Sequence, residues 1–328
     1  MTPLVITVIV LALIFDFLNG IHDSSNIVAT MISSRALSPR TALSMTAVAE
    51  FFGPFIFGVA LANTIGNEVV VADAISIQVL LAALISAIIW NLLTWYLGFP
   101  SSSSHAMIGG FIGAVVMGAS WHAIKFSGLW KILIALFTSP LIGFLLGFLI
   151  LRLTFLFAWN ATPRINSFFK RSQVVTALAL ALSHGANDAQ KTMGIITLAL
   201  VIGGYLKGFV VPAWVILLCA GMIALGTALG GWKLIRTLGG KFYKIRPVDG
   251  LSAQLTSAVV ILGASLVGGP VSTTQVVSSG IMGVGAAERM NKVRWGVAQE
   301  IATAWLLTIP STALVAAGMY WVIIQIIP

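Results

Sequence analysis

The sequence predicts an all-α polytopic membrane protein made of two repeats of about five membrane segments each, with the second repeat inverted relative to the first. Three observations support this fold class: the composition, an internal repeat and the distribution of basic residues. Of the 328 residues, 59% are hydrophobic and only 8% are charged, whereas a soluble domain has about 25% charged residues. The apolar runs are continuous, unlike the alternating segments of about ten residues in a β-barrel. A helical protein embedded in a bilayer is therefore expected.

A membrane-spanning helix needs about twenty apolar residues, and the chain contains ten candidate segments, or twelve if two of them are broken. The run from Leu4 to Phe15 lacks a basic region and a small-residue cleavage site, so we interpret it as a first span rather than a signal peptide. The shorter segments are expected to form half-helices or helical hairpins. The segments are 3–33, 41–62, 75–97, 106–120 and 129–157 in the first half, and 172–204, 211–231, 251–268, 276–287 and 296–326 in the second.

An internal repeat relates the two halves. Gly20-x-x-Asp23 recurs as Gly185-x-x-Asp188, and the stretch 100–105 recurs as 270–275. At the offset of the second pair, several glycines and the prolines Pro140 and Pro310 also coincide. We therefore divide the chain into a first repeat, a short basic joint and a second repeat. Their bounds are 1–160, 161–171 and 172–328.

The basic residues predict the orientation, because cytoplasmic loops are enriched in Lys and Arg. The 63–75 loop carries Glu68 and Asp73 and no basic residue, whereas its counterpart, 232–250, carries five. Equivalent loops should therefore face opposite sides, which makes the repeats inverted. With the N-terminus outside a plasma membrane, fourteen of the eighteen basic residues lie in the cytoplasm.

Two polar stretches, 19–26 and 183–191, interrupt the first segment of each repeat. Ionisable residues inside a membrane are costly, and they mark sites that bind something polar. We expect both stretches to break their helices and to line a shared cavity near the bilayer midplane. Asp23, Asn26, Asn187 and Asp188 are then candidate oxygen ligands for Na⁺ or candidate proton acceptors. Helix capping or polar contact between helices is the alternative.

Three further residues of the stretches carry predictions. Lys191 occupies the place that Asn26 takes in the first stretch, so it could be a fixed counter-ion that replaces a coupled cation. His22 and His184 flank the aspartates and could provide supporting contacts or relay protons.

Two hydroxyl clusters follow Pro100 and Pro270, and each precedes a glycine-rich apolar segment. Backbone N–H groups and hydroxyls at a helix N-terminus bind anions, so two such clusters could surround one tetrahedral oxyanion. Ordinary helix capping is the alternative. The residues concerned are Ser102, Ser103, Ser104, Ser272, Thr273 and Thr274, with His105 and Gln275 as candidates for supporting contacts.

Three acidic residues lie inside apolar segments, where an unpaired carboxylate would be costly. Glu50 lies in a run of small residues where helices pack closely, and we expect a functional role for it. For Asp16 and Glu300, a structural salt bridge or hydrogen bond is the simpler interpretation.

The two polar stretches and the two hydroxyl clusters together resemble the inorganic phosphate transporter family. The family's Gly-Ala-Asn-Asp signature is present at 185–188, but it ends in Lys191 where an asparagine is usual; in the first half the signature is 20–23 with Asn26. The resemblance covers about residues 12–315, and the variants are closer to the bacterial low-affinity branch. It implies phosphate uptake driven by a cation gradient, and a homodimer.

The resemblance also implies roles for individual residues. It implies cation binding by Asp23, Asn26, Asn187 and Asp188, of which Asp23, Asn26 and Asp188 would hold Na⁺ if sodium is coupled. It implies phosphate binding by 102–104 and 272–274, to which we add Gln190 and Lys191. Glu50 matches a glutamate used in transport, and its counterpart in the second half is Gln254.

The sequence thus predicts a secondary active transporter that takes up inorganic phosphate with Na⁺ or H⁺ by alternating access. Transport of another oxyanion such as sulfate, or of a metal–phosphate complex, is the alternative. A channel is disfavoured because the polar residues are concentrated at four places. An enzyme is disfavoured because the chain has a single cysteine and no histidine pair at ligand spacing. The expected partners are phosphate, the lipid bilayer and a second copy, with no cofactor and no nucleic acid.

Overall fold

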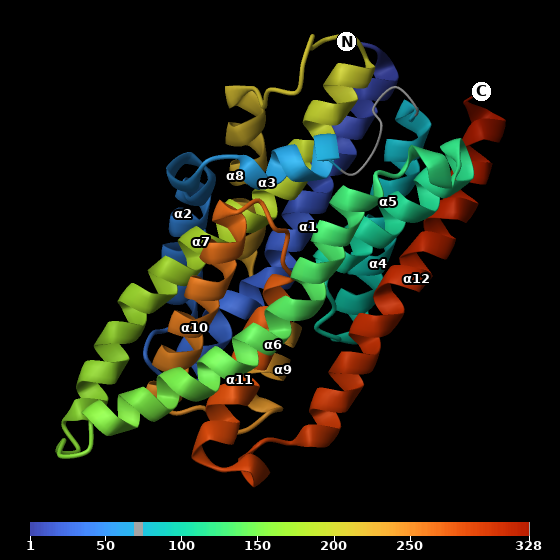
Figure 1. The fold of residues 1–328 in the computed structure, drawn as a ribbon. Helices are drawn as coiled ribbons and strands as arrows, with labels where there is room; N and C mark the ends of the chain where they lie inside the picture. The colour runs from blue at the N-terminus through green and yellow to red at the C-terminus, as the bar shows by residue number, and fades with distance from the viewer. Residues whose placement is uncertain (69–74, 328) are drawn as a thin grey trace.

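The computed structural model describes residues 1–68 and 75–327, and these residues are mainly helical with no strand (Figure 1). Asp73, which belongs to the predicted outer loop, lies outside the described residues. A π-helical turn, Thr64–Glu68, follows α3. The helices are α1 (Pro3–Ser33), α2 (Pro39–Phe57), α3 (Ala60–Asn63), α4 (Ile77–Leu97), α5 (Ser103–Ala119), α6 (Phe126–Phe157), α7 (Ile165–Ile202), α8 (Ala213–Leu229), α9 (Trp232–Gly240), α10 (Pro247–Leu266), α11 (Thr273–Glu288) and α12 (Trp295–Ile326).

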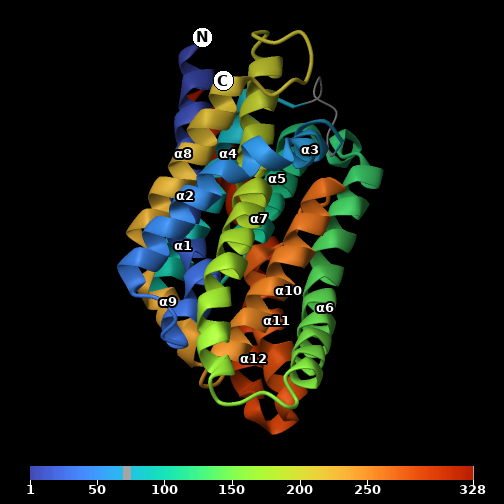
Figure 2. The ribbon, with the colours of Figure 1, turned by 90° about the vertical axis from the view of Figure 1, so that its left-hand side faces the viewer.

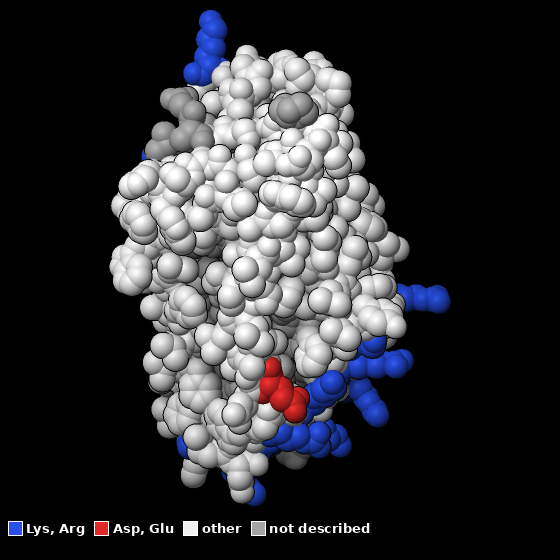
Figure 3. Space-filling view, turned by 90° about the vertical axis from the view of Figure 1, so that its right-hand side faces the viewer, with Lys and Arg blue, Asp and Glu red and all other residues white. Residues whose placement is uncertain are grey.

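The length and composition of the helices fit a multi-pass membrane protein. Five described helices are long and apolar enough to cross a bilayer, or seven if each of two bent pairs is one span. The bent pairs are α2 with α3, at 71°, and α8 with α9, at 72°. Figure 3 shows a broad band without charged side chains, and most of the Lys and Arg side chains in this view lie at the end opposite the two chain termini.

The expectation that the polar stretches break their helices is wrong, because α1 and α7 run without interruption through 19–26 and 183–191. A continuous helix satisfies its own backbone, and only the side chains then need partners. Some of these side chains bond to the preceding turn: Ser24 Oγ donates to the carbonyl of Ile21 (2.8 Å) and Ser183 Oγ to that of Ala179 (2.7 Å). The breaks lie instead after α2 and α8, where Gly58 and Gly230 have φ of 80° and 75°.

Helical hairpins formed by α4 with α5 and by α10 with α11 bring the hydroxyl clusters inside the protein. Both clusters begin a helix as predicted. Ser102 caps α5 by accepting from the N–H of His105 (3.1 Å), and Ser272 caps α11 by accepting from that of Gln275 (3.3 Å). All the residues of 101–105 and 271–275 are buried, so each turn points a helix N-terminus into the molecule.

The two halves pack against each other in an exchanged pattern. The hairpin helix α5 packs on α12, and α11 packs on α6, as Figure 2 shows for the second pair. Close contacts with glycine hold α1 and α7 to their neighbours: a Cβ atom at Gly20 would lie 2.1 Å from the carbonyl oxygen of Ile223 on α8, and one at Gly185 would lie 2.0 Å from that of Glu50 on α2. Small residues allow such approach between membrane helices, and it fixes both polar stretches in the interior.

Candidate functional site

The hydroxyl groups at the hairpin turns contact both aspartates of the polar stretches. Asp23 on α1 accepts from Thr274 at Oδ1 (3.0 Å) and from Ser103 at Oδ2 (3.3 Å). Asp188 on α7 accepts from Thr273 at Oδ2 (3.1 Å), and the same hydroxyl lies 3.5 Å from Asp23 Oδ2. Four segments that are far apart in sequence therefore meet in one buried polar cluster, as their spacing in the two halves predicted.

Lys191 is held by three oxygen atoms of different kinds. Its Nζ donates to Asp188 Oδ1, to Ser104 Oγ (2.6 Å) and to the carbonyl oxygen of Val271 (3.3 Å). A carboxylate, a hydroxyl and a backbone carbonyl are also the ligand types that hold small cations in proteins. The ammonium group thus lies where a metal cation would find its ligands.

Asn26 takes the corresponding place in the first half. Its Nδ2 donates to Asp23 Oδ1 (2.9 Å) and to Thr274 Oγ1 (3.1 Å). In each half, a side chain three residues after the aspartate bonds to that aspartate and to a hydroxyl of the hairpin from the other half. The Oδ1 atom of Asn26 is buried and accepts no hydrogen bond, so it remains available as a ligand.

A histidine joins the aspartates to Glu50. Nδ1 of His184 lies 2.6 Å from Glu50 Oε1, while its Nε2 lies 3.0 Å from Asp188 Oδ2 and 3.9 Å from Asp23 Oδ2. One ligand atom each of Asp23, His184 and Asp188 lies within 4.8 Å of the others, which is close enough for one shared cation. His22 Nδ1 lies 3.3 Å from Asp23 Oδ1. Both histidines therefore contact the cluster, as the sequence suggested.

The side chains of the cluster are fully buried, and their charges do not balance. Asp23, Glu50, Asp188 and His184 are each at most 1% exposed, and Lys191 is 2% exposed. With the carboxylates ionised and both histidines neutral, three negative charges face one ammonium group, and the cluster is net negative. An oxyanion cannot be stable next to unpaired buried carboxylates. Anion binding here therefore requires added cations or protons.

Other predicted residues lie at the edge of this cluster. Asn187 donates to Asp188 Oδ1 (3.0 Å) and to the Val271 carbonyl (3.2 Å). His105 Nδ1 lies 2.7 Å from Ser102 Oγ, and its Nε2 lies 3.4 Å from Nε2 of Gln275, which connects the two hairpin helices.

Two predicted glutamines have partners elsewhere. Gln190 accepts from the N–H groups of Leu61 (2.8 Å) and Ala62 (3.3 Å), so it caps the start of α3 after the bend. Gln254 donates to Thr30 (2.9 Å) and accepts from Thr176 (2.6 Å), which ties α10 to α1 and α7. Neither glutamine bonds to the aspartates in this structure.

The remaining acidic residues differ from each other. Asp16 is buried and accepts from Thr192 (2.5 Å), whereas Glu300 is exposed near the start of α12. The carbonyl of Val271 was missed by sequence reasoning, although three site side chains donate to it: Ser104, Asn187 and Lys191. Its place directly after Pro270, at the tip of a hairpin, was the available signal.

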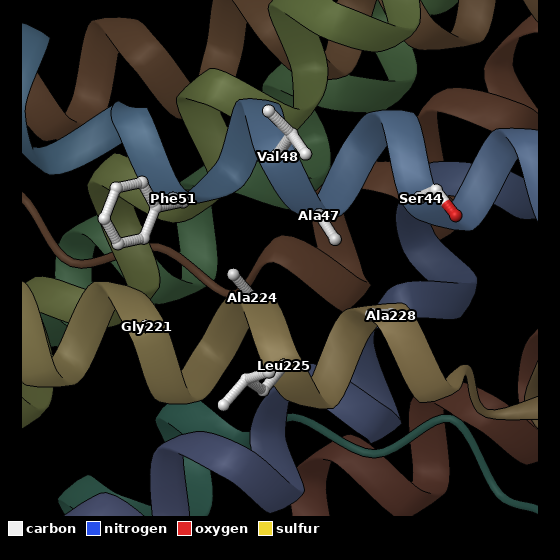
Figure 4. A pocket seen from close by; sticks show the side chains of 8 residues that line it. All are labelled: Ser44, Ala47, Val48, Phe51, Gly221, Ala224, Leu225 and Ala228. Carbon is white, nitrogen blue, oxygen red and sulfur yellow. The ribbon is translucent and has the colours of Figure 1, made fainter.

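A separate apolar groove of about 460 Å³ opens between α2 and α8 (Figure 4). Its lining is made of small and apolar side chains with one hydroxyl, that of Ser44. None of the aspartates or hairpin hydroxyls lines it, so it is distinct from the buried polar cluster.

The fold and the cluster define a polytopic helical membrane protein with a buried group of ionisable and hydroxyl side chains in its interior. The model of the phosphate transporter family matches residues 19–316, and the chain belongs to this family.

Proteins similar to this chain over nearly its whole length are named as phosphate transporters. The chain is 45% identical to a probable low-affinity inorganic phosphate transporter of Bacillus subtilis, over 98% of this chain and 97% of that protein. It is 43% identical to one of Rhizobium meliloti, over 97% and 96% of the two chains. A solved structure named the sodium-dependent phosphate transporter matches all of both chains, with a TM-score of 0.89 and 25% identity.

Proposed function

We propose that the protein takes up inorganic phosphate in symport with Na⁺ or H⁺, by alternating access. The observation that carries the proposal is the arrangement of hairpin hydroxyls on the two aspartates in a net negative cluster. The relatives, which are named as transporters, support transport rather than catalysis.

The hydrogen bonds suggest how cation and phosphate binding are linked. A hydroxyl has only one proton to donate, and those of Ser103, Thr273 and Thr274 are directed at carboxylates. A cation or proton on Asp23 or Asp188 neutralises the carboxylate, and the hydroxyls are then free to donate to phosphate. Without a bound cation or proton, phosphate is repelled by the negative carboxylates, and the hydroxyl donors are already bonded to those carboxylates. Each ligand therefore increases the affinity for the other, as reciprocal linkage requires.

Further parts of the proposal follow from the repeat and from burial. The two halves are inverted repeats, and the cluster lies near the bilayer midplane where they meet. Because the cluster is buried, the hairpins must move relative to α1 and α7 before ions enter or leave. We place the protein in the plasma membrane with its N-terminus outside, and as a homodimer.

The test is uptake of labelled phosphate by proteoliposomes that contain the purified protein. We expect accumulation only with an inward Na⁺ or H⁺ gradient. Accumulation that persists after both gradients are collapsed would disprove symport. Unlabelled sulfate should compete weakly; competition as strong as that of unlabelled phosphate would instead favour a general oxyanion carrier.

A further inference from the structure

A second buried carboxyl group lies on α1, away from the cluster. Asp16 precedes Asp23 by two helical turns, which is about 10 Å along the helix axis. Its side chain is 0% exposed. The polar residues Asp16, Asn19, Asp23 and Asn26 follow each other at intervals of three and four, so they share one face of α1. The polar face therefore extends beyond the proposed phosphate site toward the N-terminal end of the helix.

The carboxyl group of Asp16 is only half satisfied. Oδ1 accepts from Thr192 (2.5 Å), and Oδ2 has no partner. The ionisable groups that interact with it are Asp188 and Lys191 on α7, through their charges, and the adjacent Cys219 thiol on α8; α4, which also packs on α1, has no Asp, Glu, Lys, Arg, His or Cys. Lys191 is bonded to Asp188 instead. No ion pair holds Asp16 among the described residues, and burial therefore favours its neutral form.

The surroundings of Asp16 suit a proton and not a metal cation. Hard cations take about six oxygen ligands, whereas Asp16 has one hydroxyl and one thiol beside it. Among the described residues, the acidic and histidine side chains close enough to share a metal are those of Asp23, His184 and Asp188.

We propose that Asp16 is a proton-binding site of the transport cycle, separate from the cluster around Asp23 and Asp188. A proton from the aqueous phase binds Oδ2 when the helices around it are open to that side, and the neutral acid is then buried between α1, α7 and α8. The proton leaves when the helices around Asp16 open to the other side of the membrane, and no other bond forms or breaks. Thr192, which bonds to Asp16, is adjacent to Lys191 on α7. A change in the charge of Asp16 therefore acts on the same part of α7 that holds Asp188. The proposal rests on the proposed symport.

The test compares three variants in proteoliposomes with an inward proton gradient. With a gradient of about two pH units, loss of one coupled proton lowers the accumulation of phosphate by about 100-fold, because each unit corresponds to a factor of ten per proton. We expect this loss for Asp16→Asn, while exchange of phosphate without a gradient continues. Thr192→Val removes the donor to the ionised acid and should move the pH midpoint of proton-driven uptake to higher pH. Thr197→Val is the matched control, because Thr197 is also a buried threonine on α7 but its hydroxyl has no partner.

Two results overturn the assignment of Asp16. One is proton-driven accumulation by folded Asp16→Asn at the wild-type level, and the other is a pH midpoint in Thr192→Val equal to that of Thr197→Val. The second measurement decides the question if Asp16→Asn does not fold. Wild-type uptake driven by Na⁺ alone would remove the proton role of Asp16 and leave phosphate symport intact. Absence of wild-type phosphate uptake under any gradient would instead refute the proposed function itself.

Discussion

In the wild-type protein the ammonium group of Lys191 neutralises Asp188. Replacing Lys191 by asparagine should make the neutralisation of Asp188 depend on Na⁺. The ammonium group bonds to Asp188, Ser104 and the Val271 carbonyl in the interior. Removing one partner of a buried ion pair costs about 3–5 kcal/mol, because the other charge remains uncompensated. The same three oxygens then become available to Na⁺. A sodium concentration of about 100 times Kd would restore about 2.7 kcal/mol.

The assay is thermal unfolding of Lys191→Asn in detergent, with NaCl or choline chloride at equal ionic strength. We expect a lower Tm than wild type in choline and substantial recovery in sodium, with phosphate uptake becoming more dependent on Na⁺. The double variant Asp188→Asn/Lys191→Asn is the control: it leaves no unpaired charge at these two positions, so its Tm should respond to sodium no more than that of the wild type. Equal melting and equal ion dependence of Lys191→Asn and wild type would show that the lysine does not stand in for a cation.

Three other predictions concern Asp188, Gly185 and Asp249. Asp188→Asn should abolish phosphate uptake while the purified protein remains folded by size-exclusion chromatography and circular dichroism; wild-type uptake would remove Asp188 from the site. Gly185→Ala should lower the free energy of unfolding by about 1–3 kcal/mol or more, because the new Cβ would lie 2.0 Å from the carbonyl oxygen of Glu50. Gly221→Ala on α8 is the control for thermal unfolding: no atom lies within 4 Å of its new Cβ, so its stability should not fall. Asp249→Asn should lower Tm modestly, because the buried carboxylate accepts from Arg246 and Lys292 at the end of the α10–α11 hairpin opposite its turn. An unchanged Tm would show that these ion pairs do not stabilise the fold.

The hairpins could be predicted from the sequence because their signals are local. A proline, a capping hydroxyl and a glycine-rich apolar run occur within a few residues, and Ser102 and Ser272 cap their helices as expected. The meeting of the aspartates with these hydroxyls followed from the internal repeat. This prediction required no structural distances, because in transporters built from inverted repeats the corresponding segments come together at the interface between the repeats.

The continuity of α1 and α7 could not be predicted, because it depends on tertiary partners. A polar residue in an apolar segment signals a polar environment whether the helix is broken or intact. The hydroxyl of Thr274 that satisfies Asp23 lies 251 positions away in the chain. The partner of Gln190 is also distant in sequence: its side-chain oxygen accepts from the N–H of Leu61, 129 positions away, and nothing in its own segment indicates that bond.

Under the proposed symport, the difference between Asn26 and Lys191 should change the number of cations moved per cycle. Both side chains bond to the aspartate three residues before them and to a hydroxyl of the opposite hairpin, so the surroundings of the two aspartates are similar in the two halves. On the α7 side the positive charge is covalently attached and cannot be released. A mobile cation is therefore expected on the Asp23 side, where Asn26 Oδ1 is unpartnered and His184 provides a link to Glu50. A relative with asparagine at the position of Lys191 should accordingly couple one more mobile cation to each phosphate than this chain does.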